Sequence, residues 1–211
     1  MRLKCRSLAY LTIGVLAFGG WAMAAGKPAG DPYPLATDPV SGETLGKTPV
    51  IVQHEGRELR FANAANVEKF KAGPEAYIEK LDKQLIEQQS PFYPNKVCAV
   101  SGEALGGMGD AVHLIHNNRL VRLCCAGCKE ELETNAAGVF KKLDEAAIKA
   151  QSEKYPLKTC VVADGKLGSM GEPVNLVVAN RLVKLCCAGC IDEFKTAPAA
   201  YLKKIDDAKG K

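Results

Sequence analysis

Eight of the nine cysteines in this 211-residue chain fall into two groups with the same spacing. Each group ends in the run Cys-Cys-Ala-Gly-Cys, and a fourth cysteine lies 26 positions before that run. The groups are Cys98, Cys124, Cys125 and Cys128, and Cys160, Cys186, Cys187 and Cys190. Soft thiolates gathered in this way are ligands for Zn²⁺, Cu(I) or another thiophilic ion. The spacing therefore predicts two metal sites.

The two adjacent cysteines in each run are distinguished by their place at the end of a predicted strand. If strand alternation continues, Cys125 shares the core face with Leu123, and Cys124 lies on the more open face. A predicted helix follows, and its backbone N–H groups and dipole lower the pKa of a nearby thiol. We expect the ligand sets to be Cys98, Cys124 and Cys128, and Cys160, Cys186 and Cys190. Cys125 and Cys187 are either fourth ligands, which would close the site, or buried thiols.

Residues 1–24 have the pattern of a secretory signal peptide, with three early basic residues, an apolar run and a small-x-small ending at 22–24. The apolar run is shorter than the roughly 20 residues that a membrane span needs, so we expect no span after cleavage. Cleavage would lower the formal charge from +4 to +1, which gives no electrostatic basis for nucleic acid binding. We expect an exported protein, periplasmic or secreted, that begins with a linker at 25–32.

Export leaves two further interpretations of the thiols open. An even number of cysteines in an oxidising compartment also fits a disulfide-stapled repeat protein that binds another protein. The Cys125-x-x-Cys128 motif would permit a thiol–disulfide oxidoreductase, although the βαβ context of that fold is missing. A metal protein should hold about two ions per chain, whereas a stapled protein should have neither metal nor titratable thiols.

The mature chain contains three copies of one pattern, which begin at Tyr33-Pro34, Tyr93-Pro94 and Tyr155-Pro156. We call them repeat one (33–89), repeat two (93–151) and repeat three (155–208). Each runs through a short turn, two predicted strands and one or two predicted helices. This order predicts an α+β fold of three tandem modules, each a knuckle turn and β-hairpin followed by helices, which resembles a treble clef. Modules of about 55–60 residues have marginal hydrophobic cores.

The strands and helices follow from turn and breaker residues. Hairpins are predicted at 50–53 with 58–61, at 112–115 with 120–123, and at 174–178 with 182–185, with turns where Gly or Asn tolerates positive φ. In repeat one, a helix stops at Gly73 and Pro74 starts the next. The polar segments 84–89 and 145–153 are predicted to extend helices toward the following repeat.

Repeat one contains no cysteine. Asp38 stands where repeat two has Cys98, and Ala62, Asn63 and Asn66 replace the three downstream cysteines. The module is therefore expected to fold without thiols, which argues that the thiols of the other repeats have a specific task.

The cysteine pattern resembles the TRASH domain family, because Cys124 and Cys128 are spaced C-x₃-C and one cysteine lies about two dozen residues upstream. Repeat one, with Asp38-Pro-Val-Ser-Gly42 and Gly56-Arg-Glu-Leu-Arg-Phe61, resembles the related YHS domain. The resemblance covers all three repeats. It implies sensing or trafficking of heavy metals, or resistance to them. From the thiols we expect sequestration, delivery or sensing of an ion such as zinc or copper(I), and we expect the cysteine-free repeat one to be a degenerate structural module or to bind a protein partner.

No other residues form a set that indicates catalysis: there is no carboxylate pair, Ser/His/Asp set or phosphate loop, so we expect no enzyme. His113 and His116 have no counterparts in repeat three and are expected to be strand or turn residues. Met108 and Met170 are expected to pack against the hairpins. The aspartates Asp144, Asp206 and Asp207 are expected on solvated helix faces.

Overall fold

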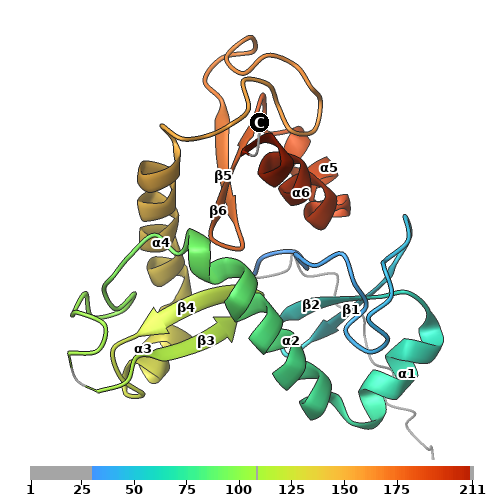
Figure 1. Ribbon diagram of the computed structural model, residues 1–211, viewed down its shortest axis with the longest axis vertical. Coiled ribbons are helices and arrows are strands. Elements are labelled where there is room, and N and C mark those ends of the chain that lie inside the picture. The colour runs from blue at the N-terminus through green and yellow to red at the C-terminus, as the bar shows by residue number, and fades with distance from the viewer. Residues whose placement is uncertain (1–29, 108, 210–211) are drawn as a thin grey trace, which may run out of the picture.

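The computed structural model describes residues 30–107 and 109–209 and shows a mixed α+β chain of three small hairpin-plus-helix units (Figure 1). This confirms the predicted fold class. The predicted signal peptide at 1–24 and most of the linker at 25–32 lie outside the described residues.

Each repeat contains one two-stranded antiparallel sheet. The strands are β1 (Val50–His54) with β2 (Arg57–Phe61), β3 (Val112–His116) with β4 (Arg119–Leu123), and β5 (Val174–Val178) with β6 (Arg181–Leu185). Two residues with positive φ join each pair: Glu55 and Gly56, Asn117 and Asn118, and Ala179 and Asn180. Two such residues are typical of a type I′ turn, whose twist matches that of the paired strands.

Two helices follow each hairpin. They are α1 (Ala64–Ala72) and α2 (Pro74–Gln89), α3 (Cys128–Thr134) and α4 (Ala136–Gln151), and α5 (Cys190–Thr196) and α6 (Pro198–Lys209). Both α2 and α6 begin with proline, which suits a first turn because its missing N–H would have no helical partner there. A short 3-10 helix, η1 (Ser90–Phe92), leads into repeat two. Within the described ranges, no helix is both long and apolar enough to cross a bilayer.

A tight turn precedes each hairpin and holds the first cysteine position. In repeat two, the N–H of Cys98 donates to the carbonyl of Glu103 at 2.7 Å, and the N–H of Gly102 donates back to the carbonyl of Cys98 at 3.1 Å. Gly102 has φ +78°, and Gly42 and Asp164 have left-handed φ at the same point of the other repeats. The knuckle turn is thus common to the three repeats, with or without cysteine.

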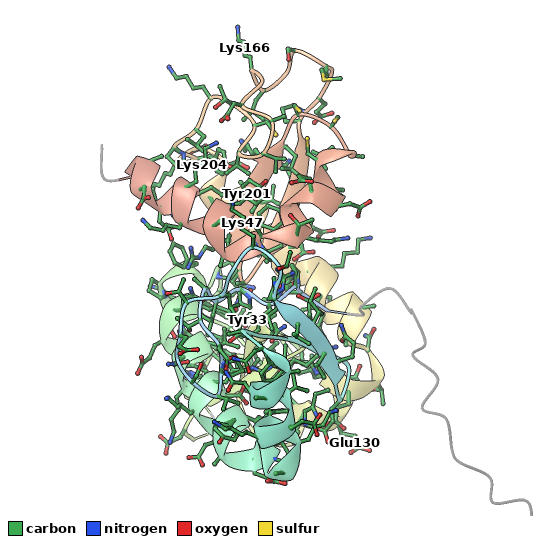
Figure 2. The ribbon with its side chains drawn as sticks, turned by 90° about the vertical axis from the view of Figure 1, so that its right-hand side faces the viewer. Tyr33, Lys47, Glu130, Lys166, Tyr201 and Lys204 are labelled. Carbon is green, nitrogen blue, oxygen red and sulfur yellow. The ribbon has the colours of Figure 1, made fainter. Side chains whose placement is uncertain are left out.

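The three repeats touch one another in a triangular arrangement (Figure 1). The helix α2 packs against β3 and β4, and α4 packs against β5 and β6. Repeats one and three meet where the guanidinium of Arg60 donates to the carbonyls of Lys195 and Thr196, at 2.5 and 2.6 Å. Figure 2 shows Lys47 at this junction, where it lines the same crevice as Pro198.

Two glutamines tie the long helix of one repeat to the hairpin of the next. The buried amide of Gln89 donates to the carbonyl of Asn118 at 2.9 Å and accepts from the N–H of Leu120 at 2.8 Å. Gln151 makes the same two bonds to repeat three, at 2.8 and 2.9 Å. The predicted polar helix extensions therefore fix the spacing between neighbouring repeats.

Each repeat has its own small core. Phe61 and Phe70 dominate repeat one, Leu123 and Leu132 repeat two, and Phe194 repeat three. The tyrosine that opens each repeat packs on that core. Because cores of this size are marginal on their own, the contacts between repeats contribute to the stability of the whole chain.

Candidate metal centre

The structure brings six cysteines together in two clusters of three. Within each cluster, all Sγ atoms lie within 4.8 Å of one another. The clusters consist of Cys98, Cys124 and Cys128 in repeat two and of Cys160, Cys186 and Cys190 in repeat three. The last two sulfur atoms of each cluster are 3.7 Å apart. Sulfur atoms bound to one tetrahedral Zn²⁺ lie about 3.8 Å apart, given Zn–S bonds of roughly 2.3 Å. Each cluster can therefore hold a thiophilic ion with little rearrangement.

Three different elements position the thiols of a cluster. Cys98 lies in the knuckle turn, Cys124 directly follows β4, and Cys128 is the first residue of α3. The N–H of Ala99 donates to the carbonyl of Arg122 at 3.0 Å, which holds the knuckle beside the end of the hairpin. The hairpin thus brings Cys124 next to Cys98, from which it is 26 positions away in the sequence.

Backbone N–H groups surround the sulfur atom of Cys98. They belong to Val100, Ser101 and Cys124, and the Ser101 nitrogen lies 3.5 Å from Sγ. Burial raises the pKa of this thiol, but these bonds, together with one from the Ser101 hydroxyl, outweigh burial and lower the pKa to about 6. These contacts favour the thiolate form of Cys98, which is the form that binds metal ions.

Repeat three has the same arrangement around Cys160. Burial raises its pKa, and N–H groups of Ala163, Cys186 and Val162 lower it by more. The ammonium group of Lys204, on α6, holds the knuckle in place through the Asp164 carboxylate at 2.6 Å. Figure 2 shows Lys204 below the loop that carries Lys166. We call the backbone N–H groups that surround the first cysteine position of a repeat the anion cradle.

Repeat one shows that the anion cradle also accepts oxygen. Asp38 occupies the position of Cys98: its Oδ1 accepts from the N–H groups of Val40 and Ser41, at 2.7 and 3.1 Å, and its Oδ2 accepts from that of Ala62, at 2.6 Å. Burial raises the pKa of this carboxyl, but the hydrogen bonds outweigh burial and lower it. The donors correspond one for one to those around the two cysteines.

Asparagines fill two of the three remaining cysteine positions of repeat one, and Ala62 fills the third. The side chain of Asn66 donates to Asp38 Oδ2 at 2.9 Å, and Asn63 caps α1 by accepting from the Asn66 N–H at 3.0 Å. Polar contacts thus replace the thiol cluster, and the predicted correspondence between these residues and the cysteines agrees with their placement.

The expected effect of the helix start on thiol pKa applies to only part of each cluster. The pKa of Cys125 is lowered by the N–H groups of Gly127 and Cys128. The pKa of Cys128 is instead raised to about 12, because desolvation and the neighbouring thiols Cys124 and Cys98 favour its protonated form. The prediction was therefore wrong for Cys128, and it is wrong for Cys190, whose pKa is also raised to about 12 by desolvation and its neighbours. A metal-free cluster keeps a proton that an ion would displace.

Cys125 and Cys187 lie at the edges of the clusters. The sulfur of Cys125 is 3.9 Å from that of Cys124 and 4.0 Å from that of Cys128, and Cys187 is 4.0 Å from Cys190. Both edge cysteines are half-exposed, whereas Cys124 is 2% exposed. The expectation that Cys125 lies on the core face was wrong, because β4 ends two residues before it and strand alternation does not continue.

The other candidate residues lie away from the clusters. His113 and His116 belong to β3, as expected, and are not among the clustered groups of the described chain. Met170 is 70% exposed, so its predicted packing against a hairpin was wrong. Its counterpart Met108 lies outside the described residues.

Sequence reasoning missed a set of three ion pairs, each between a buried arginine and a partly exposed aspartate. Each joins the first residue of the second hairpin strand to an aspartate 25 positions later: Arg57 with Asp82, Arg119 with Asp144, and Arg181 with Asp206. Asp144 and Asp206 were expected on solvated faces and their side chains are 39% and 37% exposed, but each also accepts from a guanidinium that is at least nine-tenths buried. The sequence signal that could have revealed these pairs is the identical spacing between arginine and aspartate in all three repeats.

The chain matches no protein-family model, and comparisons with curated proteins and with solved structures gave no match. Its function is therefore argued from its own geometry.

Proposed function

We propose that this chain is an exported metal-binding protein that holds one thiophilic ion, zinc or copper(I), in each of the clusters of repeats two and three. Its role would be to sequester, deliver or sense that ion, without catalysis. The resemblance to TRASH and YHS domains supports this proposal. Repeat one would be a structural module or would bind a protein partner.

One observation supports the proposal above the others. Repeat one builds the same hairpin, helices and anion cradle with Asp38 and Asn66 in place of Cys98 and Cys128. The fold therefore does not need thiols at these positions. Three thiols gather within 4.8 Å of one another in each of two clusters, and a ligand that the three share explains this better.

Metal content and thiol counts of anaerobically purified protein test the proposal. The native chain should contain about two ions, with thiols that react only after a chelator is added. Cys128→Ser should remove one ion, and adding Cys190→Ser should remove the second. Asn66→Ser changes the equivalent position of repeat one and should leave both ions bound. Retention of two ions by the double cysteine variant would refute the assignment.

The alternatives give different results in the same samples. The eight cysteines of the described chain are free thiols in this structure, but a disulfide-stapled protein would contain no metal and would change mass only on reduction. A thiol–disulfide oxidoreductase would reduce disulfide substrates and lose that activity in Cys125→Ser, because Cys125 and Cys128 are its candidate pair, 4.0 Å apart.

A further inference from the structure

The three buried arginines that begin β2, β4 and β6 differ in their second partners. Arg57 donates from Nε to Oδ1 of Asn118, at 2.7 Å. Arg119 donates from Nε and Nη2 to the two carboxylate oxygens of Asp31, at 2.8 and 2.6 Å. In both cases the oxygen comes from outside the arginine's own repeat.

Arg181 is the exception. One of its terminal nitrogens donates to Asp206, but its Nε is buried and has no partner within residues 30–107 and 109–209. Its side chain is only 5% exposed. A buried donor without an acceptor is costly, and such groups need a specific explanation. In the other two repeats, an oxygen atom from outside the repeat accepts from this Nε. The Oδ1 of Asp206, in the same ion pair as Arg181, is likewise buried without a hydrogen-bond partner in the described residues.

Arg181 lines a cavity of about 510 Å³ between repeats two and three. Lys154 and Lys209 also line it, and its lining within the described residues includes no acidic residue. Asp206 lies beside it, where it pairs with Arg181 and, at 3.7 Å, with Lys209. The remaining walls are mainly aromatic or proline side chains, among them Phe92, Tyr93, Tyr155, Pro94 and Pro156. The cavity thus combines positive charge with flat apolar walls.

The corresponding cavity beside Arg57 has a different character. It measures about 490 Å³, but Glu55, Asp82 and Glu133 line it. Arg57 also has a buried nitrogen without a partner there, yet three carboxyl groups disfavour an anion. Of these two cavities, the one beside Arg181 combines a guanidinium that has an unpartnered nitrogen with a lining that, within the described residues, carries no acid.

We propose that the cavity beside Arg181 binds a small organic anion that has a carboxylate group and an aromatic body. The carboxylate would take the edge of Arg181 that Asp31 fills on Arg119, with two parallel hydrogen bonds. Lys154 and Lys209 add positive charge, and the aromatic body packs against the tyrosines. The ring of Phe92 lies over the guanidinium, 4.3 Å from Cζ to ring centroid, and must turn aside to admit the carboxylate.

Phenylacetate is a suitable probe, because it carries both features. In a titration of the full chain followed by NMR, the Nε–H resonance of Arg181 should shift saturably as it gains an acceptor. Phenylacetamide has the same body without the charge, and acetate has the charge without the body, so both should bind at least about tenfold more weakly. No saturable shift up to about 10 mM phenylacetate, or an equal response to the amide, would overturn the proposal.

Two double variants separate the site from general charge effects. Lys154→Ala with Lys209→Ala leaves the Arg181–Asp206 pair in place and should weaken phenylacetate binding about tenfold. Lys149→Ala with Lys203→Ala removes the same charge from residues that do not line the cavity, and should leave binding unchanged. Equal weakening of phenylacetate binding in the two double variants would contradict the proposed site. Since the metal clusters are separate, the Cys128→Ser, Cys190→Ser chain should bind phenylacetate as the native chain does.

Discussion

The carboxylate of Asp38 accepts a hydrogen bond from the side-chain amide of Asn66, at 2.9 Å, at the two positions that Cys98 and Cys128 occupy in the next repeat. An acid and an amide thus stand in for two thiols within the same backbone. The backbone provides the anion cradle, and the side chains decide what occupies it. This relationship allows the structural and the metal-binding parts of the module to be tested separately.

Replacing Asp38 with asparagine should destabilise the chain. Asp38 accepts through both oxygens, from the N–H groups of Val40 and Ser41 on one side and from Ala62 and Asn66 on the other. Asparagine has one acceptor oxygen, so its NH₂ group would face donors. We expect the free energy of unfolding at neutral pH to fall by about 2–3 kcal/mol, as measured by urea denaturation.

The native and Asp38→Asn chains should differ less in their free energy of unfolding at acidic pH. Hydrogen bonds outweigh burial and hold the pKa of Asp38 below its ordinary 3.8 in the folded chain. Its contribution is therefore complete above the unfolded pKa and is lost as the pH falls through the folded pKa. The difference in free energy of unfolding between the native and Asp38→Asn chains should become smaller below about pH 4. Replacement of the exposed Asp207 with asparagine should change the free energy of unfolding little at any pH. A loss of stability in Asp38→Asn that stays the same at all pH values would contradict this account.

A third metal site should result from restoring the cysteines of repeat one. The variant Asp38→Cys, Ala62→Cys, Asn66→Cys places thiols where repeats two and three have theirs. If the anion cradle and backbone are sufficient, metal content should rise from about two to about three ions per chain. Asp38→Cys alone offers one thiol and should add no ion. A folded triple variant that still holds two ions would show that the backbone alone does not make the site.

The sequence predicted most of the fold because its local signals agree with one another. Asn117 and Asn118 give positive φ where a hairpin needs it, and Pro74 starts a helix where Gly73 ends one. The repeated cysteine spacing likewise predicted that the thiols of each repeat would gather. The choice of three among the four came from strand alternation, which ends before Cys125. These features depend on neighbours in the chain or on a repeat that can be compared with itself.

Features that depend on where an element ends or on packing between repeats were not predicted. The exposure of Cys125 depends on where β4 ends, and the partners of Arg119 depend on contacts with two other parts of the chain. Asp31 was assigned to a linker, yet it pairs with Arg119 across 88 positions. No local pattern reports such a contact, since it arises only when the repeats meet.

Arg119 should therefore be among the most sensitive positions for stability. Its guanidinium joins Asp31, Asp144 and the carbonyl of Val177, and it is buried. Arg119→Ala would leave the largely buried Asp31 without its counterion, so the free energy of unfolding should fall by about 3–5 kcal/mol. Lys203→Ala, which removes an exposed ion pair with Asp207, should cost no more than about 0.5 kcal/mol. Similar losses in the two variants would contradict the role assigned to Arg119.

The edge cysteines provide the test of how each cluster closes. Cys125 lies 3.9 and 4.0 Å from two of the clustered thiols, which matches the spacing of ligands on one ion, and its half-exposed side chain is free to rotate inward. We expect it to be the fourth ligand. With Co²⁺ as a spectroscopic probe, Cys125→Ser should keep its ion but lower the thiolate charge-transfer absorbance of that site by about a quarter.

The matched variants Cys187→Ser and Cys124→Ser decide between the two coordination numbers. Cys187→Ser should reproduce the loss of absorbance in repeat three, because its sulfur stands in the same relation to Cys190, at 4.0 Å. Cys124→Ser removes a buried member of the cluster and should abolish binding at its site. Unchanged absorbance in both edge variants would mean that three thiolates hold each ion and that the fourth position is open, as exchange of the ion with a partner would require.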